Sequence, residues 1–401
     1  MSEQRTETDS GTDHSGATTL YFGPWYRRGP FFEAARRSGA TGHDIYNHMY
    51  LPASYSDPVD EYWHLLNHVT LWDVSVERIV EIQGPDAFRF TDMLTPRDLS
   101  TCAPGRGRYV VISAESGGIV NDPVLLRLAE DRFWLAAADS DLLLWAKGVA
   151  VFANMDVQIR EPDASALQIQ GPKAKDVVSA LLGNRVEGLG YYHCAELDLD
   201  GIPLVVSRTG WTGEIGYELY LCDGSRGDEL WDRIMQAGRP FDIRPIAPSD
   251  ARRVEAGIFN YGSDFSLENT PLEVTGLERM VDPSKDRAYI GSDALERQRR
   301  EGVRRKLVGV EITGAPLVPE ATQFWPVFDE AGEIGHTTVA VYSPRLEKNV
   351  GYAWVPIERA EPGTALTVRT EHGDTREATV SPIPSWIRPR PSPGRSRKAP
   401  P

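Results

Sequence analysis

An aspartate at position 122 is the residue of this chain best placed to do chemistry. Asp122 follows the turn Gly117-Gly118 and directly precedes Pro123 and the apolar run 124–128, which predicts a carboxylate at the mouth of a buried strand. A carboxylate held there can stabilise a positive charge that develops in a reaction, or take up a proton. An aspartate after a turn also commonly caps that turn. Position alone favours capping, so Asp122 is a candidate that needs support from the rest of the chain.

Glu218 is a second carboxylate in an unusual place. It lies in the strand-like run 216–221, between Tyr217 and Leu219. A charged group in an apolar strand either faces solvent or is held by polar partners, because an unpaired buried charge is costly. Both interpretations fit the sequence equally well, and the second would provide an acceptor for a polar ligand.

Two histidine pairs have the spacing of metal ligands but lack the rest of a metal site. His64 and His68 are four residues apart on a predicted helix, without the glutamate that a zinc-protease helix carries. His43 and His48 have no third ligand at a readable spacing. The sequence also has no phosphate-binding loop, no dinucleotide fingerprint and no nucleophile elbow. We therefore expect no metal, no nucleotide-dependent chemistry and no serine hydrolase.

A repeated phrase shows which elements position these residues. Ile-Gln-Gly-Pro-x-Ala occurs at 82–87 and at 169–174, each time after a short alternating strand and before a helix. Glycine accepts unusual backbone angles and proline is tolerated in the first turn of a helix, so each phrase marks a change from strand to helix. Strands and helices alternate without a strict βαβ rhythm, which predicts an α+β fold with an internal duplication.

The chain divides into four expected regions. Residues 1–18 are polar and predict a disordered leader, and 388–401 form a tail rich in proline and arginine. Between them we expect a body of two subdomains at 19–300 and a C-terminal β domain at 306–387. The latter rests on strand-like runs at 307–312, 337–342, 350–355, 365–370 and 378–380.

The composition limits the possible binding partners and the cellular compartment of the protein. The 401 residues carry a net charge of −15, which argues against nucleic acid or an anionic membrane as the main partner. The three cysteines form no CxxC pair, so neither a disulfide framework nor a zinc ribbon is indicated. No apolar run is long enough to span a membrane, and the N-terminus lacks the apolar core of a signal peptide. We expect a cytoplasmic protein.

Taken together, the motifs resemble those of the glycine-cleavage T-protein family of tetrahydrofolate-dependent enzymes, over about residues 43–385. In chain order they are Trp-Asp-Val-Ser at 72–75, the two Ile-Gln-Gly-Pro phrases, Met-Leu-Thr-Pro-Arg-Asp at 93–98, Gly-Gly-Ile-Val-Asn-Asp at 117–122, Arg-Thr-Gly-Trp-Thr-Gly-Glu-Ile-Gly-Tyr-Glu at 208–218, Glu-Ala-Gly-Ile-Phe-Asn-Tyr-Gly-Ser-Asp at 255–264, Thr-Pro-Leu-Glu at 270–273 and Tyr-Ser-Pro-Arg-Leu-Glu-Lys-Asn-Val-Gly-Tyr at 342–352.

Within that family the likeness is greatest to the dimethylsulfoniopropionate demethylase branch. It rests on the segments 46–52, 72–78, 121–123 and 138–145. Two features of the sequence differ from the patterns of this family. The segment 210–216 is nearer to the T-protein and dimethylglycine-oxidase pattern. The arginine that T-proteins use for folate falls at Ser249, with Arg252 and Arg253 a short way on.

The resemblance implies a fold, a cofactor and roles for four residues. The family fold has three subdomains around a central folate channel, the third being a C-terminal antiparallel β-barrel-like domain. Asp122 would be the catalytic carboxylate beside N5 of tetrahydrofolate, and Glu218 would bind the pterin ring. Trp211 and Tyr109 would line the folate channel.

The resemblance also implies a reaction, with alternatives left open. A demethylase would move a methyl group from a small donor to N5 of tetrahydrofolate and would need no lipoyl-protein partner. The donor could be a sulfonium, a betaine or methylated amine, or a methyl ether. An aminomethyltransferase would instead need a lipoyl protein and would yield methylene-tetrahydrofolate. Non-catalytic folate-binding relatives carry a Lys-Gly-Cys-Tyr signature, whereas the corresponding region here, 270–278, has no cysteine.

Overall fold

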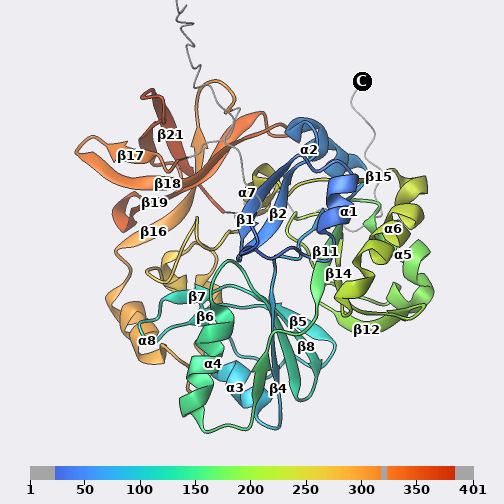
Figure 1. The fold of residues 1–401 in the computed structure, drawn as a ribbon. Helices are drawn as coiled ribbons and strands as arrows, with labels where there is room; N and C mark the ends of the chain where they lie inside the picture. Colours follow the sequence, from blue (N-terminus) through green and yellow to red (C-terminus); the bar gives the residue numbers. More distant parts are fainter. Residues whose placement is uncertain (1–22, 318–322, 384–401) are drawn as a thin grey trace, which may run out of the picture.

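The computed structural model describes residues 23–317 and 323–383. The predicted leader 1–18 and the tail 388–401 lie outside these residues. Three bodies surround a central region (Figure 1): two open sheets with their helices, and a C-terminal barrel. The α+β prediction and the three-part arrangement are confirmed. No helix among the described residues has the length and apolar character needed to cross a membrane.

The first sheet has five strands in the order β10-β4-β9-β8-β5. Its apolar core includes side chains from the helices α3 and α4. The hairpin β6–β7 and the loop that carries Asp122 lead into this sheet. The elements are β4 (Ile79–Gln83), α3 (Ala87–Leu94), β5 (Arg106–Tyr109), β6 (Ile112–Ser113), β7 (Ile119–Asn121), β8 (Val124–Ala129), β9 (Arg132–Ala136), α4 (Leu142–Ala153) and β10 (Gln158–Arg160).

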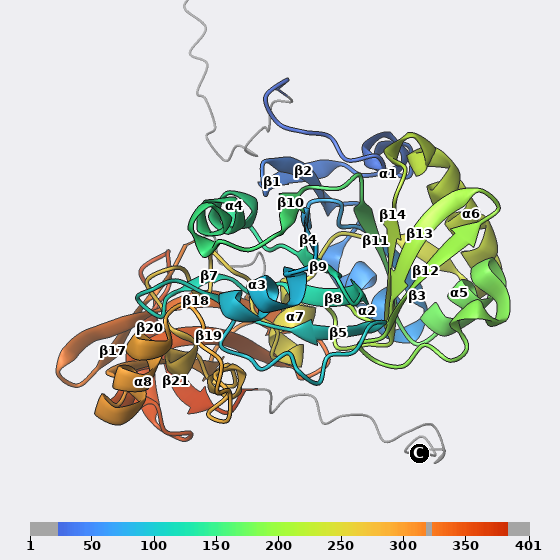
Figure 2. The same cartoon turned by 90° about the horizontal axis from the view of Figure 1, so that it is seen from below.

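The second sheet has six strands in the order β12-β13-β14-β11-β3-β15, and only the β15–β3 pair is parallel. Figure 2 shows α5 and α6 on its outer side and the first sheet on its inner side. A shared apolar cluster joins the two sheets; it includes Trp72, Trp134 and Tyr220. The elements are β3 (Val69–Asp73), β11 (Ser165–Gln170), α5 (Ala174–Leu182), β12 (Cys194–Leu199), β13 (Ile202–Ser207), β14 (Gly216–Leu221), α6 (Gly227–Gly238) and β15 (Ile243–Pro245).

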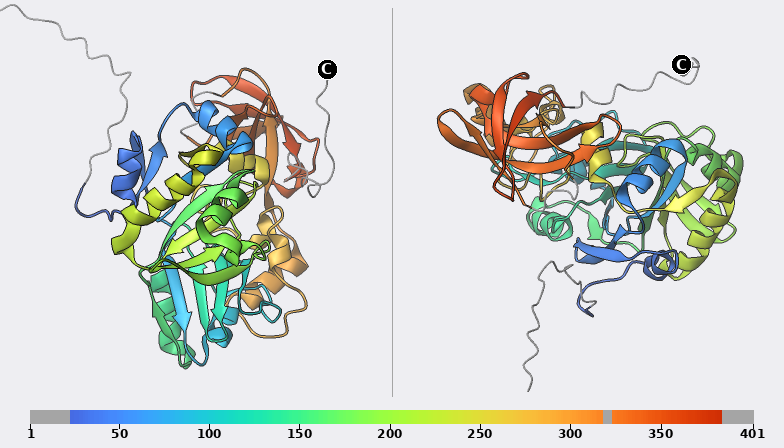
Figure 3. Two further views of the ribbon diagram at one scale, coloured as in Figure 1. Left: turned by 90° about the vertical axis from the view of Figure 1, so that its right-hand side faces the viewer. Right: turned by 90° about the horizontal axis from the view of Figure 1, so that it is seen from above.

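Six antiparallel strands close the C-terminal barrel in the order β16-β19-β18-β17-β20-β21. The five predicted strand-like runs all fall in barrel strands, whereas β17 was not predicted. Two further views show the barrel, orange to red, as a body of its own (Figure 3). Its strands are β16 (Arg305–Ile312), β17 (Pro326–Asp329), β18 (Gly332–Ser343), β19 (Lys348–Pro356), β20 (Ala365–Arg369) and β21 (Thr375–Ser381).

The remaining elements link the three bodies. Helix α7 packs against the barrel strands β18 and β19, and α2 packs beside β3. The linking elements are α1 (Phe32–Arg37), β1 (Gly42–Tyr46), β2 (Met49–Ser54), α2 (Pro58–Asn67), α7 (Asp250–Ala256) and α8 (Ser292–Glu301).

The two repeated phrases form the predicted strand–turn–helix units. Gly84 lies between β4 and α3 with φ of 138°, and Gly171 lies between β11 and α5 with φ of 124°. A Cβ atom on Gly171 would lie 2.7 Å from the carbonyl oxygen of His68. Both the backbone angle and the close approach therefore require glycine.

We predict that Gly171→Ala lowers the free energy of unfolding by roughly 2–4 kcal/mol, because it combines backbone strain with a backbone clash. Gly148→Ala is the matched control, since a Cβ there meets nothing within 4 Å on the exposed side of α4. This control should be neutral or should stabilise by about 0.5–1 kcal/mol. Urea unfolding checks both values, and equal stability of the two variants would contradict the account of the repeat.

Candidate functional site

Asp122 lies at the junction between β7 and β8 and is 9% exposed. The hydroxyl of Tyr109 donates a hydrogen bond to its Oδ2 at 2.7 Å, while Oδ1 has no partner among the residues that the structure describes. Burial raises the pKa of Asp122 to about 7, and the Tyr109 hydrogen bond offsets only part of this rise. At neutral pH the carboxyl group is therefore poised between its two protonation states.

The preceding residue, Asn121, anchors this part of the chain. Its side-chain amide donates to the carbonyl of Ala138 at 3.0 Å and to Oγ of Ser140 at 2.7 Å. It also accepts from the backbone N–H of Ala138 at 3.1 Å, and it is completely buried. Neighbouring side chains of an extended chain point in opposite directions, so this anchoring leaves Asp122 on the other side.

Glu218 lies in β14, where hydrogen-bond donors surround its buried carboxylate. The carboxylate accepts from Gln168 Nε2 at 2.8 Å and from the hydroxyl of Tyr220 at 2.7 Å. The hydroxyls of Thr209 and Ser207 donate to the same group. Of the two interpretations that the sequence left open, the structure supports the interior one, with polar partners.

A third carboxylate, Glu77, extends this network. It lies on the segment 74–78, which leads from β3 in the second sheet to β4 in the first. Gln168 Nε2 bridges the two acids, since it also donates to Glu77 Oε1 at 3.2 Å, while Gln168 Oε1 has no partner in the described parts of the chain. Burial raises the pKa of Glu77 well above its ordinary value, and the nearby Glu218 raises it further.

Sequence reasoning missed both Glu77 and Gln168. The one available signal was a glutamine within the apolar strand 166–169. Within the described residues, no arginine or lysine lies within 4.0 Å of the Glu77 carboxylate. Glu77 is therefore a partly buried acid without a cationic partner there.

The three carboxylates influence the pKa values of three tyrosines, Tyr46, Tyr192 and Tyr109. Burial raises the pKa of Tyr46, and both Asp122 and Glu77 raise it further. Burial also raises the pKa of Tyr192, to which Glu218 adds. Tyr109 is influenced in turn by both Asp122 and Tyr192, after burial as the main cause of its raised pKa. Because charges act on a pKa only at short range, the three acids lie near one another, around these phenols.

Trp211 has a more peripheral setting than Tyr109. Its indole N–H donates to the carbonyl of Phe259 at 3.3 Å, and its ring packs against the apolar cluster that joins the sheets. The guanidinium of Arg253 lies 5.6 Å from its ring centroid. The structure therefore brings Tyr109 directly to Asp122, and it places Trp211 at the edge of the inter-sheet cluster.

The two arginines after Ser249 are committed to buried ion pairs. Ser249 caps α7, where its Oγ accepts from the backbone N–H of Arg252 at 3.4 Å. Arg252 pairs with Glu214 at 3.1 Å and also with Glu255, and Arg253 pairs with Asp264 at 2.6 Å and also with Asp250. Neither guanidinium is free to take over the folate contact expected of the family's arginine.

The histidine pair of α2 acquires a third polar partner in the structure. His64, His68 and Asp242 each place a possible ligand atom within 4.8 Å of the others. However, Lys173 Nζ lies 3.1 Å from His68 Nδ1, and Arg244 lies 3.3 Å from the Asp242 carboxylate. Both cations would repel a divalent ion from this position.

Comparisons with known proteins agree with this architecture. A family model described as the GCVT N-terminal domain matches residues 31–285, and one described as the glycine cleavage T-protein C-terminal barrel domain matches 305–386. The dimethylsulfoniopropionate demethylase of Ruegeria pomeroyi is 37% identical over 354 residues, which cover 88% of this chain and 96% of that protein. An aminomethyltransferase of Desulfitobacterium hafniense is 32% identical over 347 residues, which cover 85% and 93%.

One solved structure shows the shared fold. The glycine cleavage system aminomethyltransferase T from Bartonella henselae superposes with a TM-score of 0.81 at 24% sequence identity. The match covers 90% of this chain and 98% of that one.

The raised pKa of Asp122 makes stability depend on pH. The folded state prefers the protonated carboxyl group, so this preference stabilises the fold fully below about pH 4 and is lost as the pH rises through about 7. We predict that Asp122→Asn is more stable than the parent at pH 8.5, by on the order of 3 kcal/mol, with a smaller gap at pH 5.5.

Urea unfolding at the two pH values tests this prediction. Asp131→Asn, in the exposed turn between β8 and β9, is the matched control and should show no such pH-dependent gap. A gap for Asp122→Asn that stays constant between the two pH values would contradict the assignment.

Proposed function

Because the chain belongs to the glycine cleavage T-protein family, we propose that it transfers a methyl group from a small cationic donor to N5 of tetrahydrofolate. The chain is an enzyme, as are the relatives named above. The observation that carries the proposal is the buried Asp122 carboxyl, whose Oδ1 lacks a partner among the described residues and which has Glu77 and Glu218 in its vicinity.

The acceptor atoms of Asp122 and Gln168 fit a reduced folate. A pterin ring presents several N–H groups, and such donors need acceptors when they leave water. Asp122 Oδ1 and Gln168 Oε1 are buried acceptors that have no partner in the described structure, and Glu218 lies beside Gln168. We therefore assign the pterin to Glu218 and Gln168, and N5 to the neighbourhood of Asp122. Tyr109 and Trp211 would border the bound ring.

Asp122 has two tasks in this proposal. Bound tetrahydrofolate supplies N5 as the acceptor of the methyl group. The methyl group leaves a sulfonium or quaternary nitrogen, which becomes neutral, and N5 exchanges its proton for the methyl group. The ionised carboxylate of Asp122 stabilises the positive charge near the reacting atoms, and Oδ1 can take up the released proton. A pKa of about 7 suits this second task at neutral pH.

Glu77 supports a donor that carries positive charge. Glu77 is partly buried, its carboxyl has no cationic partner in the described structure, and the nearby Glu218 adds to the negative potential. A sulfonium or quaternary ammonium group cannot donate a conventional hydrogen bond, but it is attracted by carboxylates and aromatic faces. Both donor types satisfy this requirement better than a neutral methyl ether does.

The alternative reaction is aminomethyl transfer, which the aminomethyltransferase relatives support. True T-proteins usually carry two aspartates where this chain has Asn121 and Asp122. Asn121 here is committed to the loop after β9, so a single carboxylate remains at the reacting position. We favour demethylation for this reason, without a lipoyl-protein partner and in the cytoplasm, the compartment that the sequence favours.

Product analysis tests the proposal directly. The enzyme is incubated anaerobically with tetrahydrofolate and either dimethylsulfoniopropionate or glycine betaine, and the folate product is identified by mass. We expect 5-methyl-tetrahydrofolate. Asp122→Asn, which preserves shape, should reduce the rate by about a hundredfold or more while still binding folate. Methylene-tetrahydrofolate formed with an aminomethyl donor, or a near-normal rate of Asp122→Asn, would contradict the proposal.

Glu77→Gln separates donor binding from folate binding. The glutamine can still accept the Gln168 hydrogen bond but carries no charge. We predict that KM for the cationic donor rises about tenfold, with a smaller change in the folate Kd. Glu33→Gln, on the exposed face of α1, is the control and should change neither value. A rise in the folate Kd alone would contradict the assignment of Glu77 to the donor.

A further inference from the structure

Five arginines lie on the segments that meet near Tyr191 and Tyr192. The arginine cluster comprises Arg97, Arg106, Arg108, Arg208 and Arg279. None of the five has an acidic group within 4.0 Å in the described structure, whereas Arg287 nearby is held by both Asp92 and Asp98. The chain has a net charge of −15, so acidic residues are in excess and could have paired with these arginines. A group of arginines without acidic partners is therefore unexpected.

Backbone hydrogen bonds fix much of this arrangement. The N–H of Gly107 in β5 donates to the carbonyl of Tyr192 at 2.7 Å, and the N–H of Tyr192 donates to the carbonyl of Arg208 at 3.1 Å. Arg106 forms an antiparallel bridge with His193. Three segments that are distant in sequence are thus fastened together, with arginines on both sides of the tyrosine pair.

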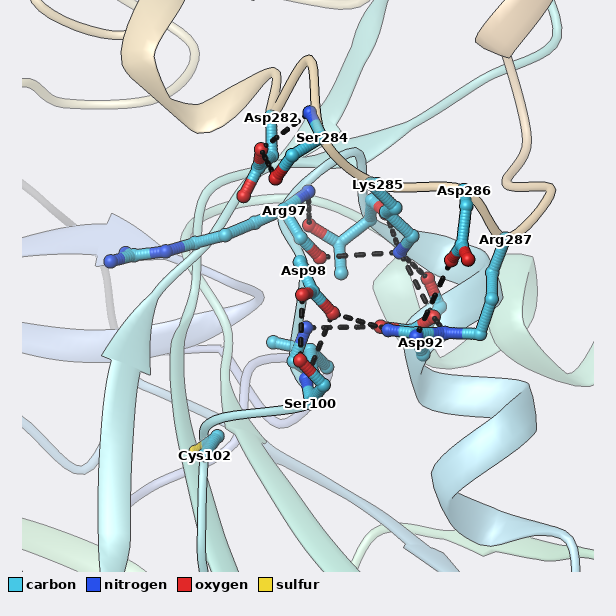
Figure 4. A network of polar contacts seen from close by, with 12 residues as sticks. Asp92, Arg97, Asp98, Ser100, Cys102, Asp282, Ser284, Lys285, Asp286 and Arg287 are labelled. Atoms are coloured by element: carbon cyan, nitrogen blue, oxygen red, sulfur yellow. Dashed lines mark hydrogen bonds and ion pairs between the residues drawn. The ribbon is translucent and has the colours of Figure 1, made fainter.

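Arg97 and Arg279 approach the same place from another direction. One Arg97 nitrogen donates to the carbonyl of Tyr109 at 2.5 Å and lies 3.5 Å from the sulfur of Met280, the residue after Arg279. Figure 4 shows the Arg97 side chain extending away from the ion pairs around Lys285. Burial lowers the pKa of Arg97, and the positive charges of Arg108 and Arg279 lower it further. The cluster therefore holds like charges close together without compensation.

The tyrosine pair connects the cluster to the carboxylate site. Tyr191 is 70% exposed, and its ring meets that of Tyr192 edge-on at 4.7 Å between centroids. Burial raises the pKa of both phenols, and Glu218 is among the groups that raise each of them. A ligand that extends from Glu218 along the rings of Tyr191 and Tyr192 would contact an aromatic surface first and the arginine cluster next.

We propose that the arginine cluster binds the γ-linked glutamate tail of the folate cosubstrate and prefers tails of several glutamates. The inference rests on the proposed function. Ser249 stands where the family has its folate-binding arginine, and Arg252 and Arg253 form ion pairs with buried acids. The positive charge that binds the glutamate tail must therefore come from other residues. Each added glutamate contributes one carboxylate, and guanidinium groups bind carboxylates in a well-matched planar geometry. The exposed Tyr191 suits the aromatic ring that precedes the tail.

Binding of folates with different tails tests the inference. Dissociation constants of the full chain are measured anaerobically, by calorimetry, for tetrahydrofolate with one and with five glutamates. We expect the pentaglutamate to bind about tenfold more tightly, with a gap that narrows at high salt. The double variant Arg106→Gln/Arg279→Gln changes two exposed members of the cluster and should remove most of this preference.

The control is Arg89→Gln/Arg359→Gln, which removes the same charge from ion-paired arginines elsewhere and should keep the preference. Equal affinity of the parent for both tails would overturn the inference but leave the proposed function standing. A preference that survives in the cluster variant, or that disappears in the control, would also overturn it. Failure to bind either folate would instead overturn the proposed function.

Discussion

The main constraint on the site is that two acids, Asp122 and Glu77, have little access to solvent and form no ion pair in the described structure. Asp122 is buried and Glu77 is partly buried; each receives one side-chain hydrogen bond, and neither has a basic partner in the described structure. Such groups destabilise a fold unless a ligand compensates them, because ionised carboxylates lose their hydration on burial. The surroundings of these acids are therefore suited to a ligand that brings N–H donors and positive charge. A reduced folate with a cationic methyl donor supplies both.

Several other buried charges in the described structure are paired and have a structural task. Glu255 of α7 accepts from the hydroxyl of Tyr62 in α2 at 2.6 Å and pairs with Arg345, which follows β18, at 3.0 Å. Arg253 pairs with Asp264, which also accepts from Thr338 of the barrel at 2.7 Å. These contacts join the barrel to the body. Breaking one partner of a buried pair typically costs about 3–5 kcal/mol, so they hold the three bodies around the site.

The parts of the fold that depend on local sequence patterns could be predicted from the sequence. The Gly-Pro phrases predict both strand-to-helix changes, and the barrel strands show clear runs; β17 is short and its pattern too weak to be recognised. Asp122 and Glu218 stand out as acids in apolar surroundings, and their catalytic and pterin-binding roles remain predictions. The Gln168 bridge, the third partner Asp242 and the arginine cluster were not predictable, since their members come from distant segments that only tertiary packing brings together.

A crystal structure of the complex with 5-methyl-tetrahydrofolate would show directly where the folate lies relative to Asp122 and Glu218. We expect the pterin edge to be hydrogen-bonded to Glu218 and Gln168, and N5 with its methyl group to lie beside Asp122. A folate bound away from these residues, or bound there with N5 remote from Asp122, would contradict the proposed assignment.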